Sequence, residues 1–89
     1  MYEVELTRRA LHEFNRLSLT NQGRIEAELD CLSANPRPQG IRKIYGNIYR
    51  IRIGGWRVIY TVFDRDRLVL VGRIIRRSED TYDRVKDLF

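Results

Sequence analysis

The sequence is poor in the residues from which disulfides and metal sites are built. Among its 89 residues there is one cysteine, Cys31, and one histidine, His12. A single cysteine excludes an internal disulfide, and with only one histidine beside it a zinc site is not expected. We therefore expect no metal or other cofactor, with Cys31 as a small core residue and His12 as a partly buried or surface residue.

Long apolar runs are also missing. No stretch of about 18 apolar residues is present to cross a membrane, and the N-terminus has no apolar core of the kind found in signal peptides. The expectation is a cytoplasmic protein with no membrane contact. At 43% apolar content, 89 residues can build one hydrophobic core but not two, so we predict a single domain spanning residues 1–89.

Lysine is scarce although the chain is basic. There are 17 Lys and Arg residues against 12 Asp and Glu, which gives a net charge of +5, and only Lys43 and Lys86 are lysines. Such a charge attracts polyanions, and guanidinium groups bind phosphate with two parallel hydrogen bonds and stack on bases, which suits RNA. A GC-rich genome explains the same ratio without any function, so the positions of the arginines carry more weight.

The spacing of apolar residues predicts a strand and two helices in the first part of the chain. Residues 2–6 alternate as a strand does. Thr7 and Thr20 are expected to cap the two helices, and the prolines of residues 35–38 end the second helix because they cannot continue its hydrogen bonds. The apolar faces predicted for the helices are Ala10, Leu11, Phe14 and Leu17 on the first, and Ile25, Leu29 and Leu32 on the second.

From Ile41 onward the apolar residues recur with period two. Strands are expected near residues 41–45, 48–53, 56–63 and 68–75, and a short amphipathic helix over residues 79–89 with Tyr82, Val85, Leu88 and Phe89 on its apolar side. The predicted fold class is α+β, in the order β-α-α-β-β-β-β-α. Two N-terminal helices pack on one face of a twisted, largely antiparallel sheet.

Gly54-Gly55 predicts a tight two-residue hairpin, because both positions can adopt positive φ. Such a loop places Ile53 opposite Trp56 and Arg52 opposite Arg57, and the same pairing then places Arg50 opposite Ile59. Arg50, Arg52 and Arg57 thus share one face. Like charges directly opposite each other destabilise a sheet, so the arrangement favours a phosphate-binding cleft, although a solvated sheet face is the alternative.

The same reasoning extends the cleft to the last strand. If the next turn keeps Phe63 opposite Leu68, then Gly72, Ile74 and Arg76 fall on the arginine side. Gly72 would lie opposite Ile59, where its missing side chain leaves a shallow groove.

Groups for the usual hydrolytic chemistry are not found together in this sequence: there is no Ser-His-Asp set, no glycine-rich phosphate loop and no acidic metal motif. RNA, however, supplies its own nucleophile, the ribose 2′-hydroxyl. A protein need only align it and stabilise the developing charge, which positioned cations can do. Arginine cannot act as an ordinary base, so Tyr82 is the candidate base, with a role as an anchor for the last helix as the alternative.

Three segments together resemble the RelE/ParE toxin superfamily over nearly the whole chain. They are VELTRRAL from Val4, KIYGNIYRIRIGGWRVIY from Lys43 and RRSEDTY from Arg76. The middle segment follows the pattern K-L-x-G…Y-R-I-R-x-G-x-Y-R-V-I-Y of that superfamily, with Ile44 and Trp56 as variants. The resemblance implies a compact sheet with two N-terminal helices and, for the RelE-like branch, a type II toxin that cleaves mRNA in the ribosomal A site without a metal.

The resemblance also implies the site and the partners. In the RelE-like branch the reaction is carried by basic residues of the central strands, an arginine after the hairpin turn, a late arginine and a C-terminal tyrosine. Here those roles fall to Arg50, Arg52, Arg57, Arg77 or Arg76, and Tyr82, with Arg42, Lys43, Arg73 and Arg76 as further RNA-binding residues. Strand alternation favours Arg76 as the late arginine, and motif alignment favours Arg77. The partners would be the ribosome, mRNA and an acidic antitoxin that folds on binding.

This chain departs from the pattern at two places and leaves two other functions open. It has Arg50 and Arg52 where well-known members carry lysines, and Arg76 where histidine is common. The first alternative is the ParE-like branch, which poisons DNA gyrase. The second is a non-catalytic RNA-binding module or a decayed toxin that keeps the basic face.

Overall fold

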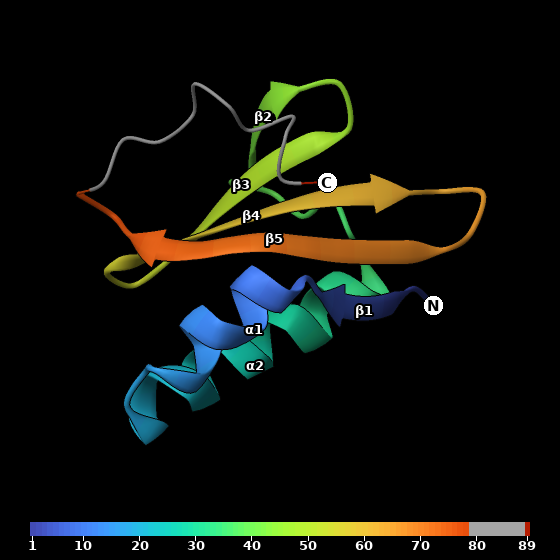
Figure 1. Cartoon of the computed structure of the whole chain (residues 1–89). Coiled ribbons are helices and arrows are strands. Elements are labelled where there is room, and N and C mark those ends of the chain that lie inside the picture. Colours follow the sequence, from blue (N-terminus) through green and yellow to red (C-terminus); the bar gives the residue numbers. More distant parts are fainter. Residues whose placement is uncertain (79–88) are drawn as a thin grey trace.

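The computed structural model describes residues 1–78 and Phe89, and it has two layers, with the helices on one side of a five-stranded sheet (Figure 1). The predicted α+β class is confirmed. The elements are β1 (Glu3–Leu6), α1 (Arg8–Asn15), α2 (Leu19–Ala34), β2 (Arg42–Tyr45), β3 (Ile48–Ile53), β4 (Trp56–Phe63) and β5 (Leu68–Arg76). The helix expected over residues 79–89 lies outside the described residues except for Phe89.

The sheet has the strand order β1-β5-β4-β3-β2. The first strand pairs with β5 in parallel, and the other three pairs are antiparallel, so the prediction of a largely antiparallel sheet is confirmed. We call the face covered by the helices the inner face and the opposite one the outer face. In the described part of the chain, neither helix is long and apolar enough to span a membrane.

Side-chain hydroxyls begin both helices, as expected, but one of the two was predicted wrongly. The Thr7 hydroxyl accepts a hydrogen bond from the Ala10 amide at 3.2 Å and caps α1. The cap of α2 is Ser18, which accepts from the Asn21 amide at 3.2 Å while its own backbone is extended. The helix therefore starts at Leu19, and Thr20 already lies in its first turn.

The main core lies between the helices and the inner face. From the helices it contains Ala10, Ile25, Leu29 and Leu32; from the sheet it contains Tyr49, Ile51, Ile53, Val58, Tyr60, Val62, Val69, Val71 and Ile74. Two predicted core residues do not belong to it, because Cys31 is exposed and Leu11 is 49% exposed. Each neighbours a buried residue in sequence, Leu32 and Ala10, and one residue along a helix turns a side chain by about 100°.

A register shift in β5 overturns the expectation for Gly72. The pairing runs as predicted from Phe63 opposite Leu68 to Tyr60 opposite Val71, but the next partner of Ile59 is Arg73 rather than Gly72. One extra residue in a strand makes a β-bulge, and it reverses which face the following side chains occupy. The predicted pairing of Gly72 with Ile59 therefore does not form, and Ile74 and Arg76 fall on the inner face instead of the outer one.

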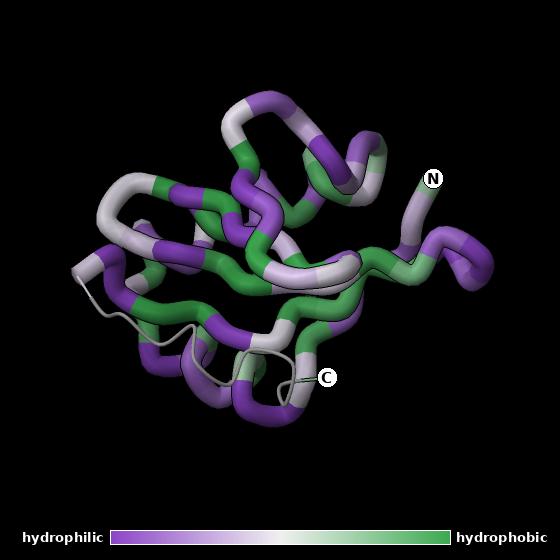
Figure 2. The backbone as a smooth tube through the Cα atoms, turned by 90° about the horizontal axis from the view of Figure 1, so that it is seen from above, coloured by the Kyte–Doolittle hydropathy of each residue, from purple (hydrophilic) through white to green (hydrophobic). Residues whose placement is uncertain are grey.

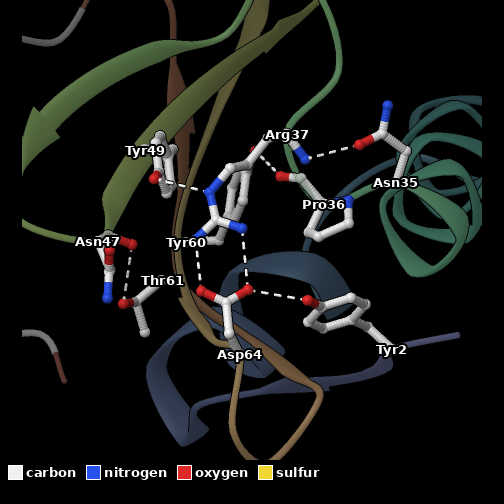
Figure 3. Close-up of polar contacts among 9 residues, drawn as sticks. All are labelled: Tyr2, Asn35, Pro36, Arg37, Asn47, Tyr49, Tyr60, Thr61 and Asp64. Carbon is white, nitrogen blue, oxygen red and sulfur yellow. Dashed lines mark hydrogen bonds and ion pairs between the residues drawn. The ribbon is translucent and has the colours of Figure 1, made fainter.

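A polar network ties the loop after α2 to the turn after β4 (Figure 3). The Arg37 guanidinium forms an ion pair with Asp64 at 2.8 Å and donates to the Tyr49 hydroxyl at 2.9 Å. The Tyr2 hydroxyl donates to the same carboxylate at 2.8 Å. These donors lower the pKa of Asp64 to about 2, with Arg37 as the larger cause. Arg37 is therefore committed to a structural contact.

Candidate nucleic-acid interface

The hairpin between β3 and β4 has the register predicted from Gly54-Gly55. Arg52 pairs with Arg57, and Arg50 pairs with Ile59. Of the two glycines, only Gly54 has its φ in the left-handed region, at 59°, which fits a type II′ turn. The side chains of Arg50, Arg52 and Arg57 therefore share the outer face, as expected from the sequence.

A fourth arginine joins them from the edge strand β2. Arg42 pairs directly with Arg50, and directly paired residues point to the same side of a sheet. We name the set Arg42, Arg50, Arg52 and Arg57 the arginine face. Figure 2 views the sheet from the side opposite the helices and shows hydrophilic and hydrophobic residues alternating along these strands. Two rows of paired arginines thus lie next to each other near the hairpin end of the sheet.

The arginine face combines exposed and buried guanidinium groups. Arg42 and Arg52 are exposed and Arg57 is half-buried, whereas Arg50 is only 7% exposed. The Arg50 Nε is buried and has no hydrogen-bond partner among the described residues. A buried donor that lacks a partner is costly, and an anion that accepts its hydrogen bond would remove that cost. The buried Arg50 therefore favours a phosphate-binding role for this face over a solvated surface.

Isoleucines lie between and beside these arginines. Ile48, Ile59 and Ile75 form a small buried cluster on the outer face, and Phe89 packs against it. Apolar neighbours exclude water, and a charge interacts more strongly with an anion where water is excluded. The arginine face can therefore stabilise negative charge more effectively than the same arginines would on a fully wet surface.

Three of the predicted RNA-binding residues do not join these four arginines, although Arg73 pairs with Ile59 in the same row as Arg50. Arg73 forms an ion pair with Glu13 of α1 at 2.8 Å, and only 12% of its side chain is exposed. The Arg76 guanidinium lies over the Trp56 ring, 5.1 Å from its centroid, on the inner face. Lys43 pairs with Tyr49, which places it on the inner face as well. None of these three joins the arginine face.

The backbone of Arg77 extends the pairing beyond β5. Its amide donates to the Gly55 carbonyl at 2.8 Å, and its side chain is exposed. Since Ile75 lies on the outer face, the alternation of the strand directs Arg77 to that face and Arg76 away from it. Of the two late arginines left open by the sequence, Arg77 has the position that fits the site. Tyr82 lies outside the described residues.

Glu13 is a structural residue that sequence reasoning missed. Its carboxylate accepts from the Ile74 amide at 2.8 Å and from Arg73 Nε at 2.9 Å. It thereby provides a hydrogen-bond acceptor at the edge of β5, beyond Val71, where the pairing with β1 ends. Glu13 lies three residues after Ala10 and one before Phe14, on the inward side of α1, and an acid at such a position was the available indication of a buried partner.

A pocket and the distribution of possible metal ligands also bear on function. A pocket of about 290 Å³ opens on the inner side, lined by Glu13, Arg16, Leu17, Trp56, Ile74, Ile75 and Arg76. None of its lining residues belongs to the arginine face. Within residues 1–78 and Phe89, no three His, Cys, Asp or Glu side chains come together as a metal site would require.

Comparison with known proteins gives consistent matches. The family model described as the ParE toxin of the type II toxin-antitoxin system, parDE, matches residues 4–81. The putative toxin RelE1 of Methanocaldococcus jannaschii is 32% identical over 82 residues, which cover 86% of this chain and 91% of that protein.

The fold also matches solved structures. A chain of the archaeal RelE-RelB complex from Pyrococcus horikoshii superposes with a TM-score of 0.81 at 24% identity, covering 89% of this chain and 98% of that one. The isolated E. coli RelE toxin superposes with a TM-score of 0.80 at 22% identity, covering 100% of both chains.

Proposed function

Since the chain belongs to the RelE-like branch of the RelE/ParE superfamily of type II toxins, we propose that it is a ribosome-dependent endoribonuclease that cleaves mRNA in the A site. The observation that carries the proposal is the arginine face. Four arginine side chains lie on one side of the sheet, and the buried Nε of Arg50 has no hydrogen-bond partner among the described residues. This arrangement suits a phosphodiester that gains charge during reaction.

The proposed reaction uses the nucleophile of the RNA itself. The ribose 2′-oxygen gives up its proton and attacks the adjacent phosphorus, and the bond from phosphorus to the 5′-oxygen breaks. The leaving 5′-oxygen takes up a proton from the protonated base or from water, so the products are a 2′,3′-cyclic phosphate and a 5′-hydroxyl. Arg52, Arg57 and Arg77 stabilise the phosphoryl oxygens as negative charge builds up on them. Arg50, the buried member of the arginine face, holds the phosphate against the sheet. No metal is needed, because the guanidinium groups supply the positive charge.

The proton of the 2′-hydroxyl needs an acceptor. A guanidinium group remains protonated at neutral pH and cannot accept it. Tyr82 is the proposed base, since it is the one residue of the proposed set whose side chain can lose its own proton and then accept that of the 2′-hydroxyl. Its position in the sequence matches the C-terminal tyrosine of the RelE-like pattern.

The proposed partners follow from the same charge. The ribosome and mRNA are polyanions, and both place the action in the cytoplasm. An acidic antitoxin is the proposed inhibitor, which would cover the arginine face. The structural relative from Pyrococcus horikoshii was crystallised as a RelE-RelB complex, which supports a cognate antitoxin here.

The proposal is tested with purified ribosomes stalled on a defined mRNA with an empty A site. The wild-type protein should cut the A-site codon, and Arg57→Ala and Tyr82→Phe should remove both cutting and growth arrest without unfolding the protein. Arg65→Ala, an exposed arginine in the β4–β5 turn, removes the same charge and should cut normally. If Arg57→Ala and Tyr82→Phe both stay fully toxic, the proposed site is wrong.

A second candidate is inhibition of DNA gyrase, because the family model that matches residues 4–81 is that of ParE toxins. Purified gyrase and supercoiled DNA separate the two functions. Accumulated gyrase–DNA cleavage complexes together with intact mRNA would select the ParE-like function. Cut mRNA with unaffected gyrase would select the RelE-like one.

A further inference from the structure

The outer face continues beyond the arginines as a surface of a different kind. The next row along the strands contains Tyr45, Ile48, Thr61 and Leu70, and the row after it contains Phe63 and Leu68. Successive rows on one face lie about 7 Å apart, because a strand rises about 3.3 Å per residue and alternate residues share a face. We name Tyr45, Phe63, Leu68 and Leu70 the aromatic strip. It begins directly beside the row of Arg42 and Arg50.

The two rings of the strip are open to solvent. Tyr45 is 60% exposed and Phe63 is 40% exposed, and both leucines are partly exposed. Single exposed apolar side chains are common and need no explanation. Here two aromatic residues from different strands share one face with two leucines and adjoin a cationic cluster, which is typical of a binding surface.

The far edge of the strip is acidic. Glu3 and Glu5 of β1 pair in parallel with Leu68 and Leu70, so they lie on the same face, and both are exposed. Crossing the outer face, the order is therefore cations, then aromatic and aliphatic side chains, then carboxylates. Phosphates are attracted to the first region and repelled by the last, whereas uncharged, flat groups suit the middle.

A single-stranded RNA carries an anionic phosphate and a flat, uncharged base in each nucleotide. Its phosphate requires cations, and its bases have flat faces that stack on aromatic side chains. An exposed sheet face that carries aromatic rings beside basic residues is one of the ways in which proteins hold unpaired bases. Tyr45 lies one row and Phe63 two rows from Arg50, so the nucleotides that continue from a phosphate bound on the arginine face can reach both rings in turn.

We infer that Tyr45 and Phe63 form a stacking platform for the bases that flank the phosphate held by Arg50, Arg52 and Arg57. This inference rests on the proposed function and adds a specificity-determining surface to it. The arginines hold the backbone regardless of sequence, and the platform makes binding depend on the flanking bases. Purines, with their larger faces, should bind better than pyrimidines at these positions.

The first test compares Tyr45→Ala, Phe63→Ala and the double variant with the wild type in single-turnover cleavage of stalled ribosomal complexes. Each alanine should raise the concentration for half-maximal rate about tenfold, which is the effect expected from one stacked base, and leave the maximal rate within about twofold. Tyr45→Phe and Phe63→Tyr keep a ring and should restore binding. Leu19→Ala, 86% exposed at the start of α2, is the matched control and should behave as the wild type.

The second test removes the bases instead of the rings. An mRNA with an abasic nucleotide beside the scissile phosphate should weaken binding of the wild type about tenfold, but should not weaken the double variant further. Additive losses would show that the rings and the bases do not touch, and the inference would be wrong. Equal half-maximal concentrations for the wild type and the double variant would overturn it as well.

A third measurement separates this inference from the proposed function. Binding of a short fluorescent single-stranded oligoribonucleotide does not require cleavage. If the wild type binds RNA but does not cut it, the proposed function fails, and loss of binding in the double variant still supports the platform. If the double variant binds RNA normally but binds the cognate antitoxin more weakly, the strip is a protein-binding surface and the inference is overturned.

Discussion

Arg52 and Arg57 are directly paired across the β3–β4 hairpin. Opposed like charges on a sheet cost about 0.2–1 kcal/mol relative to neutral pairs. The two-residue loop at Gly54-Gly55 fixes this pairing, so it cannot be relaxed by a shift in register. The proposed function gives the pairing a purpose, because both guanidinium groups can reach one phosphate.

This relationship predicts that activity and stability separate at these two positions. Arg52→Gln and Arg57→Gln should each lower the single-turnover cleavage rate about 100-fold or more, since each removes a positioned donor to the reacting phosphate. The free energy of unfolding should change by less than about 1 kcal/mol. Urea unfolding followed by circular dichroism supplies the second value. A loss of stability well above that limit would mean that these arginines are structural.

Substitution of Glu13, in contrast to that of Arg52 or Arg57, should mainly lower the stability of the protein. Its carboxylate is 19% exposed and bonds both Arg73 and the Ile74 amide, so Glu13→Ala leaves a largely buried guanidinium and an amide without their acceptor. The free energy of unfolding should fall by about 2–4 kcal/mol, as measured by urea unfolding. Glu26→Ala, on the exposed side of α2, is the control and should change it by less than about 0.5 kcal/mol.

The two hairpin glycines should not be equivalent. Gly54 has a φ of 59°, and a Cβ there would lie 2.5 Å from the Arg24 guanidinium, whereas a Cβ on Gly55 would meet nothing within 4 Å. Gly54→Ala should destabilise the protein by about 1–2 kcal/mol because of the left-handed backbone, and Gly55→Ala by less than about 0.5 kcal/mol. Thermal unfolding measures both changes.

A double variant identifies the cause at Gly54. Arg24→Ala removes the neighbouring guanidinium but leaves the backbone strain, so it should not rescue Gly54→Ala. Full rescue would show that the contact with Arg24, and not the φ, sets the cost.

Asp64 should make the stability of the protein depend on pH in the acidic range. Its pKa is lowered from 3.8 to about 2 in the folded protein, mainly by Arg37. A depressed pKa means that the stabilisation is complete above the unfolded value and is lost as the pH falls from about 4 to about 2. Asp64→Asn should therefore be less stable than the wild type at pH 7. In urea unfolding at a series of pH values, the difference should shrink across that window, and a constant difference down to pH 2 would contradict the account.

The features that the sequence predicted well are those decided by neighbouring residues. The bounds of β3 and β4 and their pairing follow from the alternation and from a loop of two glycines, which leaves one register. The proline after Asn35 ends α2 as expected. Since the arginine face depends on that register, Arg50, Arg52 and Arg57 could be placed together without a structure.

The features that were missed depend on contacts between distant parts of the chain. The bulge in β5 lies where α1 meets the strand: the Thr7 hydroxyl donates to the Gly72 carbonyl at 3.3 Å, and Glu13 accepts from the Ile74 amide. No local pattern contains these contacts, so strand alternation alone assigned Ile74 and Arg76 to the wrong face and paired Gly72 with Ile59. Likewise, Ser18 and Thr20 are both suitable N-caps by residue type, and the local sequence does not show at which of them α2 begins.

In the proposed reaction the 2′-hydroxyl of the RNA attacks the neighbouring phosphate while the arginines hold that phosphate. The most direct test is an mRNA that carries one 2′-deoxyribose immediately 5′ of the scissile phosphate, presented in the A site of stalled ribosomes. Binding should be retained within about threefold and cleavage at this phosphate should be abolished, because the nucleophile is missing. Cleavage of the deoxy-substituted mRNA at the wild-type rate would contradict this mechanism.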